Sequence, residues 1–237
     1  MSAPTLQALV PVRGDAPFLA AALHSLRAQT FIDWQATLCP LDANARDIAM
    51  RAIDGDARMQ SADTSDMAEA SALAHAADTN ACELLCVLDG DDALEPTAFA
   101  ALMDALAEHP AAGMAYSRHV LIDANGGVLG PGPLCELPYS ADPQRPGHEI
   151  QQQRVLRRQA YRDAGGFASA HADASDYDLC LRLSETAGVV HVPQALYQRR
   201  IHPLAPEIAR WAEAIEARYG AFVDEIGRAR VGKECRL

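Results

Sequence analysis

One short segment near the middle of the 237-residue chain constrains its fold more than any other. Residues 84–88 are five consecutive apolar residues, and the next four, 89–92, read Asp-Gly-Asp-Asp. An apolar run of this length is typical of a strand that is covered on both faces, as strands in parallel sheets are. The three acids then follow the carboxyl end of a buried strand, which is where open α/β sheets bind their ligands.

The first half of the chain alternates between strand and helix patterns around this segment. Such alternation favours an α/β fold, with a mostly parallel sheet and helices on both of its faces. The loop at residues 13–17 follows the first predicted strand, so we expect it at the same sheet edge as the acids. Pro96 is expected at the first position of the helix after them. Strands are predicted at residues 6–12, 34–41, 58–62 and 84–88, and helices at 18–29, 47–53, 66–78 and 96–108.

The second half has fewer regular patterns. Asn125-Gly126 predicts a two-residue hairpin turn, and Gly165-Gly166 predicts the end of a helix. The proline-rich residues 130–147 predict a long loop. Because no repeat, linker or change in composition is present, we expect one domain with a loop-rich second half. Strands are predicted at residues 113–123, 128–129, 189–192 and 195–201, and helices at 155–164, 176–187 and 206–227.

Charge and composition argue against several kinds of partner. Twenty Lys and Arg against 32 Asp and Glu give a formal net charge of −12, which disfavours nucleic acids and anionic membrane surfaces. No apolar stretch is long enough for a transmembrane segment, and residues 1–7 lack the pattern of a secretory signal. Four of the six cysteines lie in apolar runs, which predicts buried, reduced thiols. We therefore expect a cytoplasmic protein, or one peripheral to the inner face of a membrane.

Asp89 and Asp91 are candidate metal ligands. Residues two apart in an extended segment face the same way, so the two carboxylates can converge on one ligand. Hard cations such as Mg²⁺ or Mn²⁺ bind one or two carboxylates and complete their shell with water and phosphate oxygens. Gly90 between them leaves room for a nucleotide against the backbone. For this segment alone, a polar turn whose acids face the start of the next helix is an equally good interpretation.

Two further clusters carry groups of catalytic type. Asp176 and Asp178 lie near the start of a predicted helix, where carboxylates commonly cap free backbone N–H groups. Arg182 is four residues after Asp178 and can pair with it on the helix surface, which leaves Asp176 as the better candidate for a general base. His202 ends a predicted strand, where an imidazole can bind a metal or a phosphate, or only cap the strand.

These clusters and their flanks together resemble glycosyltransferase family 2, the inverting sugar-nucleotide enzymes with the GT-A fold. The order and spacing of the segments agree, and the resemblance reaches from the first strand to His202. The segments are Val-Pro-Val at 10–12, Ser-Leu-Arg-Ala-Gln-Thr-Phe at 25–31, Leu-Cys-Val-Leu-Asp-Gly-Asp-Asp at 85–92, Tyr-Arg-Asp-Ala-Gly-Gly-Phe at 161–167, Asp-Tyr-Asp-Leu at 176–179 and Leu-Tyr-Gln-Arg-Arg-Ile-His at 196–202.

The resemblance implies a metal-dependent transfer of a sugar from a nucleoside-diphosphate donor to a glycan or lipid-linked acceptor hydroxyl, in surface polysaccharide or glycan assembly. It divides the chain into a GT-A domain at residues 1–203, with a nucleotide-binding half at 1–110 and an acceptor-side half at 111–203. Residues 204–237 would form a helical extension, which packs on its own domain or on a second subunit in a homodimer.

The resemblance also assigns roles to individual residues. The divalent cation, Mg²⁺ or Mn²⁺, would be held by Asp89, Asp91 and His202. Asp176 would be the catalytic base that takes the proton of the acceptor hydroxyl. The contacts to the donor nucleotide would come from Pro11, Arg13, Asp42, Asp89 and Gly90.

The chain departs from the family pattern at several positions. Arg13-Gly14 stands where the family usually has Tyr-Asn, the acidic loop after the second strand is reduced to residues 42–47, and Ser175 replaces a glutamate. These departures keep a second interpretation open, a GT-A domain that has lost turnover and serves as a binding or interaction module. A phosphatase with Asp89 as nucleophile and a sugar-phosphate nucleotidyltransferase fit the motifs less well.

Overall fold

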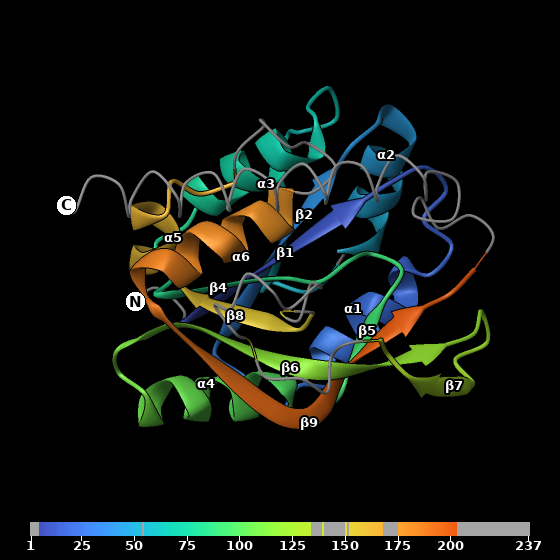
Figure 1. The fold of residues 1–237 in the computed structure, drawn as a ribbon. Coiled ribbons are helices and arrows are strands. Elements are labelled where there is room, and N and C mark those ends of the chain that lie inside the picture. Colours follow the sequence, from blue (N-terminus) through green and yellow to red (C-terminus); the bar gives the residue numbers. More distant parts are fainter. Residues whose placement is uncertain are drawn as a thin grey trace.

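Helices cover both faces of a single mixed sheet (Figure 1). The computed structural model describes residues 5–53, 55–133, 139, 150, 152–167 and 175–202, and within them nine strands and six helices are present. The strands are β1 (Leu6–Val12), β2 (Trp34–Pro40), β3 (Met59–Ser61), β4 (Leu84–Val87), β5 (Ala93–Leu94), β6 (Ala112–Ile122), β7 (Val128–Pro131), β8 (Arg154–Arg157) and β9 (Gly188–Arg200). The helices are α1 (Leu19–Arg27), α2 (Ala43–Ala52), α3 (Glu69–Asp78), α4 (Ala98–Glu108), α5 (Arg158–Asp163) and α6 (Ser175–Thr186).

The sheet joins a parallel half to a mixed half. Its strand order is β3-β2-β1-β4-β8-β6-β9-β5, and β7 pairs with β6 outside this path. The strands β3, β2, β1 and β4 are parallel, as the alternation of strand and helix patterns predicts. β8 is antiparallel to both of its neighbours, β4 and β6, while β9 is parallel to β6. The α/β class with helices on both faces is confirmed, and the second half of the sheet is mixed rather than parallel.

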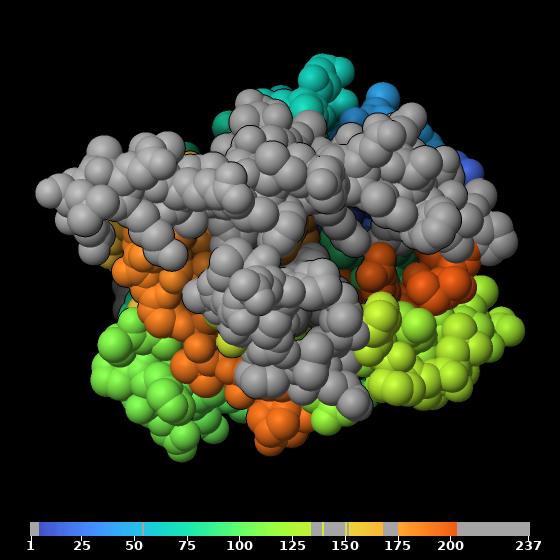
Figure 2. All heavy atoms as spheres, viewed as in Figure 1, coloured from blue at the N-terminus to red at the C-terminus, as the bar shows by residue number. Residues whose placement is uncertain are grey.

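The β6–β7 hairpin extends the sheet at one side of the molecule. Asp123 Oδ1 accepts hydrogen bonds from the backbone N–H groups of Asn125 and Gly127, both at 2.8 Å. Gly126 has a φ of 86°, a conformation that favours glycine. The structure contains the predicted hairpin, which Figure 2 shows as the yellow-green edge of the face in view. Its turn is longer than the predicted two residues, because the N–H of Asp123 donates to the carbonyl oxygen of Gly127 and leaves residues 124–126 as the loop.

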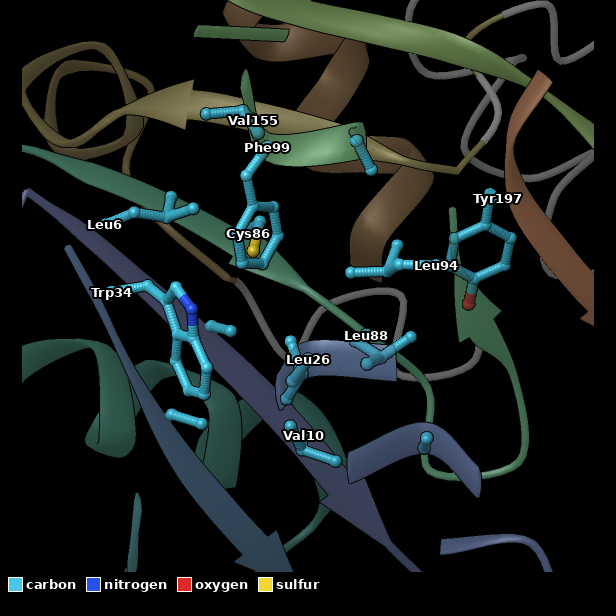
Figure 3. Packing of buried hydrophobic residues seen from close by; sticks show 14 of the residues in the cluster. Leu6, Val10, Leu26, Trp34, Cys86, Leu88, Leu94, Phe99, Val155 and Tyr197 are labelled. Carbon is cyan, nitrogen blue, oxygen red and sulfur yellow. The ribbon is translucent and has the colours of Figure 1, made fainter. Parts of the chain in front are cut away.

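Two apolar cores lie on opposite faces of the sheet, because the side chains of a strand alternate between its faces. In β1, Leu6 and Val10 belong to the core that contains residues of α1, α2 and α4, and Leu9 belongs to the core that contains residues of α3, α5 and α6. Figure 3 shows part of the first core, in which Trp34 of β2 and Phe99 of α4 are both fully buried.

Several predicted boundaries are wrong. The helix predicted at 47–53 is α2, which begins at Ala43 because Asp42 caps it there. The predicted helix at 155–164 is strand β8 followed by the shorter helix α5, because residues 154–157 pair between β4 and β6. The two strands predicted at 189–192 and 195–201 are one strand, β9. It continues past Pro193 because its register against β6 shifts there, which accommodates a residue without an N–H. Pro96 precedes α4 instead of occupying its first position.

Some predictions fall on parts of the chain that the structure does not describe. The helix predicted at 206–227 and the extension at 204–237 lie outside the described residues, as does most of the loop predicted at 130–147. Among the described residues, no helix combines the length and apolar character needed to cross a bilayer. The four described cysteines are free and buried, as predicted: Cys39, Cys82, Cys86 and Cys180.

Candidate active site

A pocket opens at the carboxyl ends of β1 and β4. Its volume is about 270 Å³, and it is lined by residues 11–17, which form the end of β1 and the loop after it, together with Gly90, Asp91 and His202. The loops after β1 and β4 meet there because the two strands are neighbours in the sheet. Five of the residues that the sequence singled out therefore line one pocket: Pro11, Arg13, Gly90, Asp91 and His202.

A carboxylate and an imidazole form a pair at this pocket. Nε2 of His202 lies 3.0 Å from Oδ2 of Asp91, although 111 residues separate the two along the chain. The side chain of His202 is 5% exposed and that of Asp91 is 30% exposed. Nδ1 of His202 is buried and has no hydrogen-bond partner among the described residues. The pair is thus a largely buried polar unit that is open to the pocket through Asp91.

The third acid of the turn, Asp92, belongs to a buried network. Its carboxylate accepts hydrogen bonds from the hydroxyl of Tyr197 at 2.6 Å and from the backbone N–H of Arg200 at 2.7 Å. Burial raises the pKa of Asp92 well above its ordinary value, and the charges of Asp89 and Asp91 raise it further, against the effect of these hydrogen bonds. Oδ2 of Asp89 lies 3.4 Å from the same Tyr197 hydroxyl. The three adjacent acids therefore have three different environments.

Asp42 supports the loop that lines the pocket and does not itself line it. Its Oδ1 accepts a hydrogen bond from the backbone N–H of Ala45 at 2.8 Å, which caps α2, and its Oδ2 accepts one from Gly14 at 2.7 Å. These bonds, that of Ala45 first, lower the pKa of Asp42. Nδ2 of Asn44 donates to Oδ1 of Asp15 at 2.9 Å in the same loop. A contact between Asp42 and a nucleotide stays a prediction.

Arg13 lines the pocket and is already paired with an acid. Its guanidinium forms an ion pair with Glu69, the first residue of α3. The Arg13 side chain is 44% exposed, so this is a surface pair that a stronger anion can replace at small cost. Arg13 is therefore available to a ligand only in competition with Glu69.

Gly90 lies where two backbones approach each other closely. A Cβ at this position would be 2.7 Å from the carbonyl oxygen of Pro11. That this glycine leaves room for a nucleotide stays a prediction. The structure adds a second reason for a glycine here: the acidic turn, residues 89–92, packs directly on the end of β1.

Asp176 lies in the first turn of α6, outside the residues that line the pocket. Its Oδ2 accepts a hydrogen bond at 2.8 Å from Nη2 of Arg154, whose side chain is 6% exposed while that of Asp176 is 39% exposed. Asp178 pairs with Arg182 at 2.9 Å across one helical turn, as the spacing predicts. Of the two acids, Asp176 is therefore the one with solvent access, and a buried arginine fixes its orientation.

The donor set around Asp91 suits a cation that also binds a phosphate. Among the described residues, no group of three or more His, Cys, Asp or Glu side chains is arranged to hold a metal ion. Mg²⁺ and related ions, however, commonly take only one or two carboxylates from the protein and complete their shell with water and substrate phosphate. Asp91 and His202, whose Nδ1 has no hydrogen-bond partner among the described residues, fit such a shared site, and they do not fit a cation held by protein side chains alone.

No role was predicted for Asp92 or Arg200, the two residues that connect the turn after β4 to β9. One signal was available: Arg200 and His202 are two apart at the end of a strand, so they share a face. An arginine that shares a face with a site residue needs polar partners if it is buried. The identity of those partners, 76 to 109 residues away, is not encoded in any local pattern.

By sequence, the chain is similar to proteins whose names refer to polysaccharide synthesis. No protein-family model matches it. It is 26% identical over 236 residues to the O-antigen biosynthesis protein RfbC of Myxococcus xanthus, a match that covers 96% of this chain and 17% of that protein. It is 28% identical over 115 residues to chondroitin synthase of Escherichia coli, which covers 48% of this chain and 17% of that enzyme. The matched regions thus cover about a sixth of the length of each of these two relatives.

Solved structures with the same fold include two with bound nucleotides. A mannosyltransferase from Pyrobaculum calidifontis, in complex with GDP-Man and Mn²⁺, matches 97% of this chain and 65% of its own at a TM-score of 0.67 and 13% identity. TarS 1-349 of S. aureus in complex with UDP matches 92% of this chain and 65% of its own at a TM-score of 0.66 and 12% identity. These likenesses confirm the GT-A fold that the sequence predicts.

Proposed function

We propose that this chain is a metal-dependent, inverting glycosyltransferase that moves a sugar from a nucleoside diphosphate to an acceptor hydroxyl. The observation that carries the proposal is the Asp91–His202 pair, which lies on a pocket bordered by the loop after β1. In sheets of this kind such a position is the usual ligand site. The names of the relatives, O-antigen biosynthesis protein and chondroitin synthase, support a role in polysaccharide assembly, with a glycan or lipid-linked acceptor.

Electrostatics favour a cation at this pocket. The carboxylates of Asp89 and Asp91 lie two residues apart on the acidic turn, in a chain of net charge −12. A diphosphate alone would be repelled by such a field, and a bound cation would invert it locally. Asp91 and His202 would hold the cation, with Asp89 beside them. When bound, it would stabilise the charge that develops on the departing diphosphate.

The residues of the chain divide the remaining tasks. Pro11 and Arg13 border the nucleotide, and Asp42 keeps their loop in place through the N–H of Gly14. Asp176 accepts the proton of the acceptor hydroxyl while that oxygen bonds to the anomeric carbon from the face opposite the diphosphate. The bond from the anomeric carbon to the diphosphate breaks, its electron pair leaves with the nucleoside diphosphate, and the anomeric configuration inverts. A positioned base of this kind typically contributes about 10²–10⁴-fold.

Calorimetry with UDP and GDP, each in Mn²⁺ and in a chelator, tests the binding half of this proposal. We expect Mn²⁺-dependent binding of at least one nucleotide, and a loss of about 10-fold or more in Asp91→Ala. Asp63→Ala is the matched control, because the Asp63 side chain is 79% exposed and does not line the pocket. Absence of binding for both nucleotides would contradict the proposal.

One observation favours a second candidate, a GT-A domain that binds without turnover. Both carboxylate oxygens of Asp42 accept hydrogen bonds from the backbone, so its reduced loop offers a nucleotide less than the family pattern does. Hydrolysis of UDP- and GDP-sugars without acceptor separates the two candidates. Release of free sugar that depends on Asp91 supports the enzyme, whereas Mn²⁺-dependent nucleotide binding without sugar release supports the binding module.

A further inference from the structure

Arg200 is buried, and the described hydrogen bonds of its guanidinium go to backbone carbonyls. The residue is 5% exposed. Nε donates to the carbonyl oxygen of Asp91 at 2.8 Å, and Nη1 donates to those of Asp123 at 2.9 Å and Ala124 at 3.3 Å. One guanidinium thus connects the acidic turn after β4 to the turn of the β6–β7 hairpin.

The backbone of Arg200 adds a second connection to the same turn. Its N–H donates to Oδ1 of Asp92 at 2.7 Å, and the hydroxyl of Tyr197, three residues earlier in β9, donates to Oδ2 at 2.6 Å. The acidic turn is therefore held from both sides. Arg200 binds its backbone at Asp91, and Asp92 binds the backbone of β9. His202 follows two residues later.

Phe18 completes the set of contacts around the pair. The guanidinium carbon of Arg200 lies 4.6 Å from the centre of the Phe18 ring, within the range of a cation–π contact. The same ring lies 4.7 Å from the imidazole of His202 in an edge arrangement. Phe18 is the N-cap residue of α1. A single arginine thus contacts the backbone of one member of the Asp91–His202 pair and the aromatic neighbour of the other.

We propose that Arg200 is a positioning residue, which sets the distance and orientation between Asp91 and His202. If this buried position served only to fill space, an apolar residue would suffice, because a buried charge is costly unless all its donors are satisfied. The planar, forked guanidinium offers several donors in fixed directions, and no other side chain reproduces that geometry. Mutation of a residue that orients a metal-binding side chain commonly lowers the affinity by about 10–100-fold. The proposal builds on the proposed function, but its first test does not need a nucleotide.

The first test observes the pair directly by NMR, at one pH and without ligand. With ¹⁵N-labelled histidine, the His202 ring is assigned through its disappearance in His202→Gln, and the shift of Nε2 on loss of its partner is calibrated with Asp91→Ala. We expect Arg200→Lys to move the Nε2 resonance toward its position in Asp91→Ala. An unchanged resonance in Arg200→Lys would overturn the proposal.

Arg158→Lys is the matched control. Arg158 is also 5% exposed and also donates to backbone carbonyls, those of Cys82 and Ala77, together with the side chain of Gln7 at 2.7 Å. None of these partners lines the pocket. We expect both lysine variants to lower the melting temperature, because both leave buried carbonyls without donors. Only Arg200→Lys should change the His202 resonance, and an equal change in both variants would mark Arg200 as merely structural.

The second test measures nucleotide affinity in the same variants. With Mn²⁺ and whichever of UDP and GDP the unaltered chain binds, we expect a loss of about 10–100-fold in Arg200→Lys and less than about threefold in Arg158→Lys. Binding of neither nucleotide by the unaltered chain would refute the proposed function, while the NMR result would still decide the role of Arg200.

Phe18→Leu keeps the proposal testable if Arg200→Lys does not fold. Phe18 is only partly buried, so this variant should fold. It removes the ring between Arg200 and His202, and we expect a displaced His202 resonance with the backbone amide spectrum otherwise retained. An unaltered His202 resonance in Phe18→Leu, with no folded Arg200→Lys, would overturn the proposal.

Discussion

Replacing Gly90 with alanine would force the acidic turn away from the loop that lines the pocket. The added Cβ would lie 2.7 Å from the carbonyl oxygen of Pro11, a distance that real Cβ atoms essentially never show. The backbone fixes both positions, so neither atom can rotate away. A tight but real contact of 3.0–3.4 Å requires a separation of roughly 0.3–0.7 Å, which is comparable to the tolerance of about 0.5 Å for a binding constellation.

We expect Gly90→Ala to lower two quantities. Overpacking of this kind typically reduces the free energy of unfolding by roughly 1–3 kcal/mol. Because Asp91 follows Gly90 directly, the displacement should also weaken Mn²⁺-dependent nucleotide binding by about 10-fold or more. Urea unfolding and calorimetry on the same preparation measure the two effects.

Gly188→Ala provides the control for Gly90→Ala. Its Cβ would meet the nearest atom, Cα of Ala112, at 3.4 Å, and Gly188 begins β9 at the end opposite His202. We expect little change in stability or affinity. If Gly90→Ala loses stability but keeps full affinity, the turn can move without disturbing the pocket, and the reasoning from the 2.7 Å approach is refuted.

Three further perturbations follow from the described contacts. Asp42→Ala should lower the free energy of unfolding by about 1–2 kcal/mol, since it removes a helix cap. The hydrogen bonds from Ala45 and Gly14 lower the pKa of Asp42. Its contribution to the free energy of unfolding is therefore fully present above the ordinary carboxyl pKa and is lost as the pH falls through the lowered one. The free energy of unfolding, measured in urea from pH 7 to 3, should depend less on pH in the variant. Burial, and then Arg199, lower the pKa of His119 to about 4 from 6.5. The unfolded chain therefore takes up this proton first, and stability should fall as the pH drops from 6.5 toward 4, an effect that unfolding curves of His119→Gln should lack. Asp176→Asn should lower turnover by about 10²–10⁴-fold with donor affinity retained; full turnover would remove Asp176 from the mechanism.

Local sequence patterns predicted the elements whose packing depends on their own residues. The predicted strand at 6–12 matches β1, because its residues pack into both cores and are therefore apolar except for Gln7. The acids that follow β4 could be placed at the pocket edge for the same reason, since parallel neighbours end on the same side. Asp91 and the loop after β1 were therefore predictable as neighbours from position alone.

Features that depend on distant partners could not be predicted in this way. Residues 154–157 form strand β8 because they pair with β4 on one side and with β6 on the other. Their sequence, Arg-Val-Leu-Arg, has no pattern that excludes a helix. Only the resemblance to a family predicted that His202 lies close to Asp91. The bond between Asp92 and the N–H of Arg200 spans 108 residues, and no periodicity within either segment indicates the other.

The order in which the pocket residues occur along the chain has a consequence for biosynthesis. Residues 11–17 and 90–91 emerge early from a ribosome, whereas His202 arrives only after β9 has been made. The parallel strands and the helices that cover them can thus be synthesised before His202, one of the residues that line the pocket. Competence to hold a ligand would then arise only once that imidazole has been made.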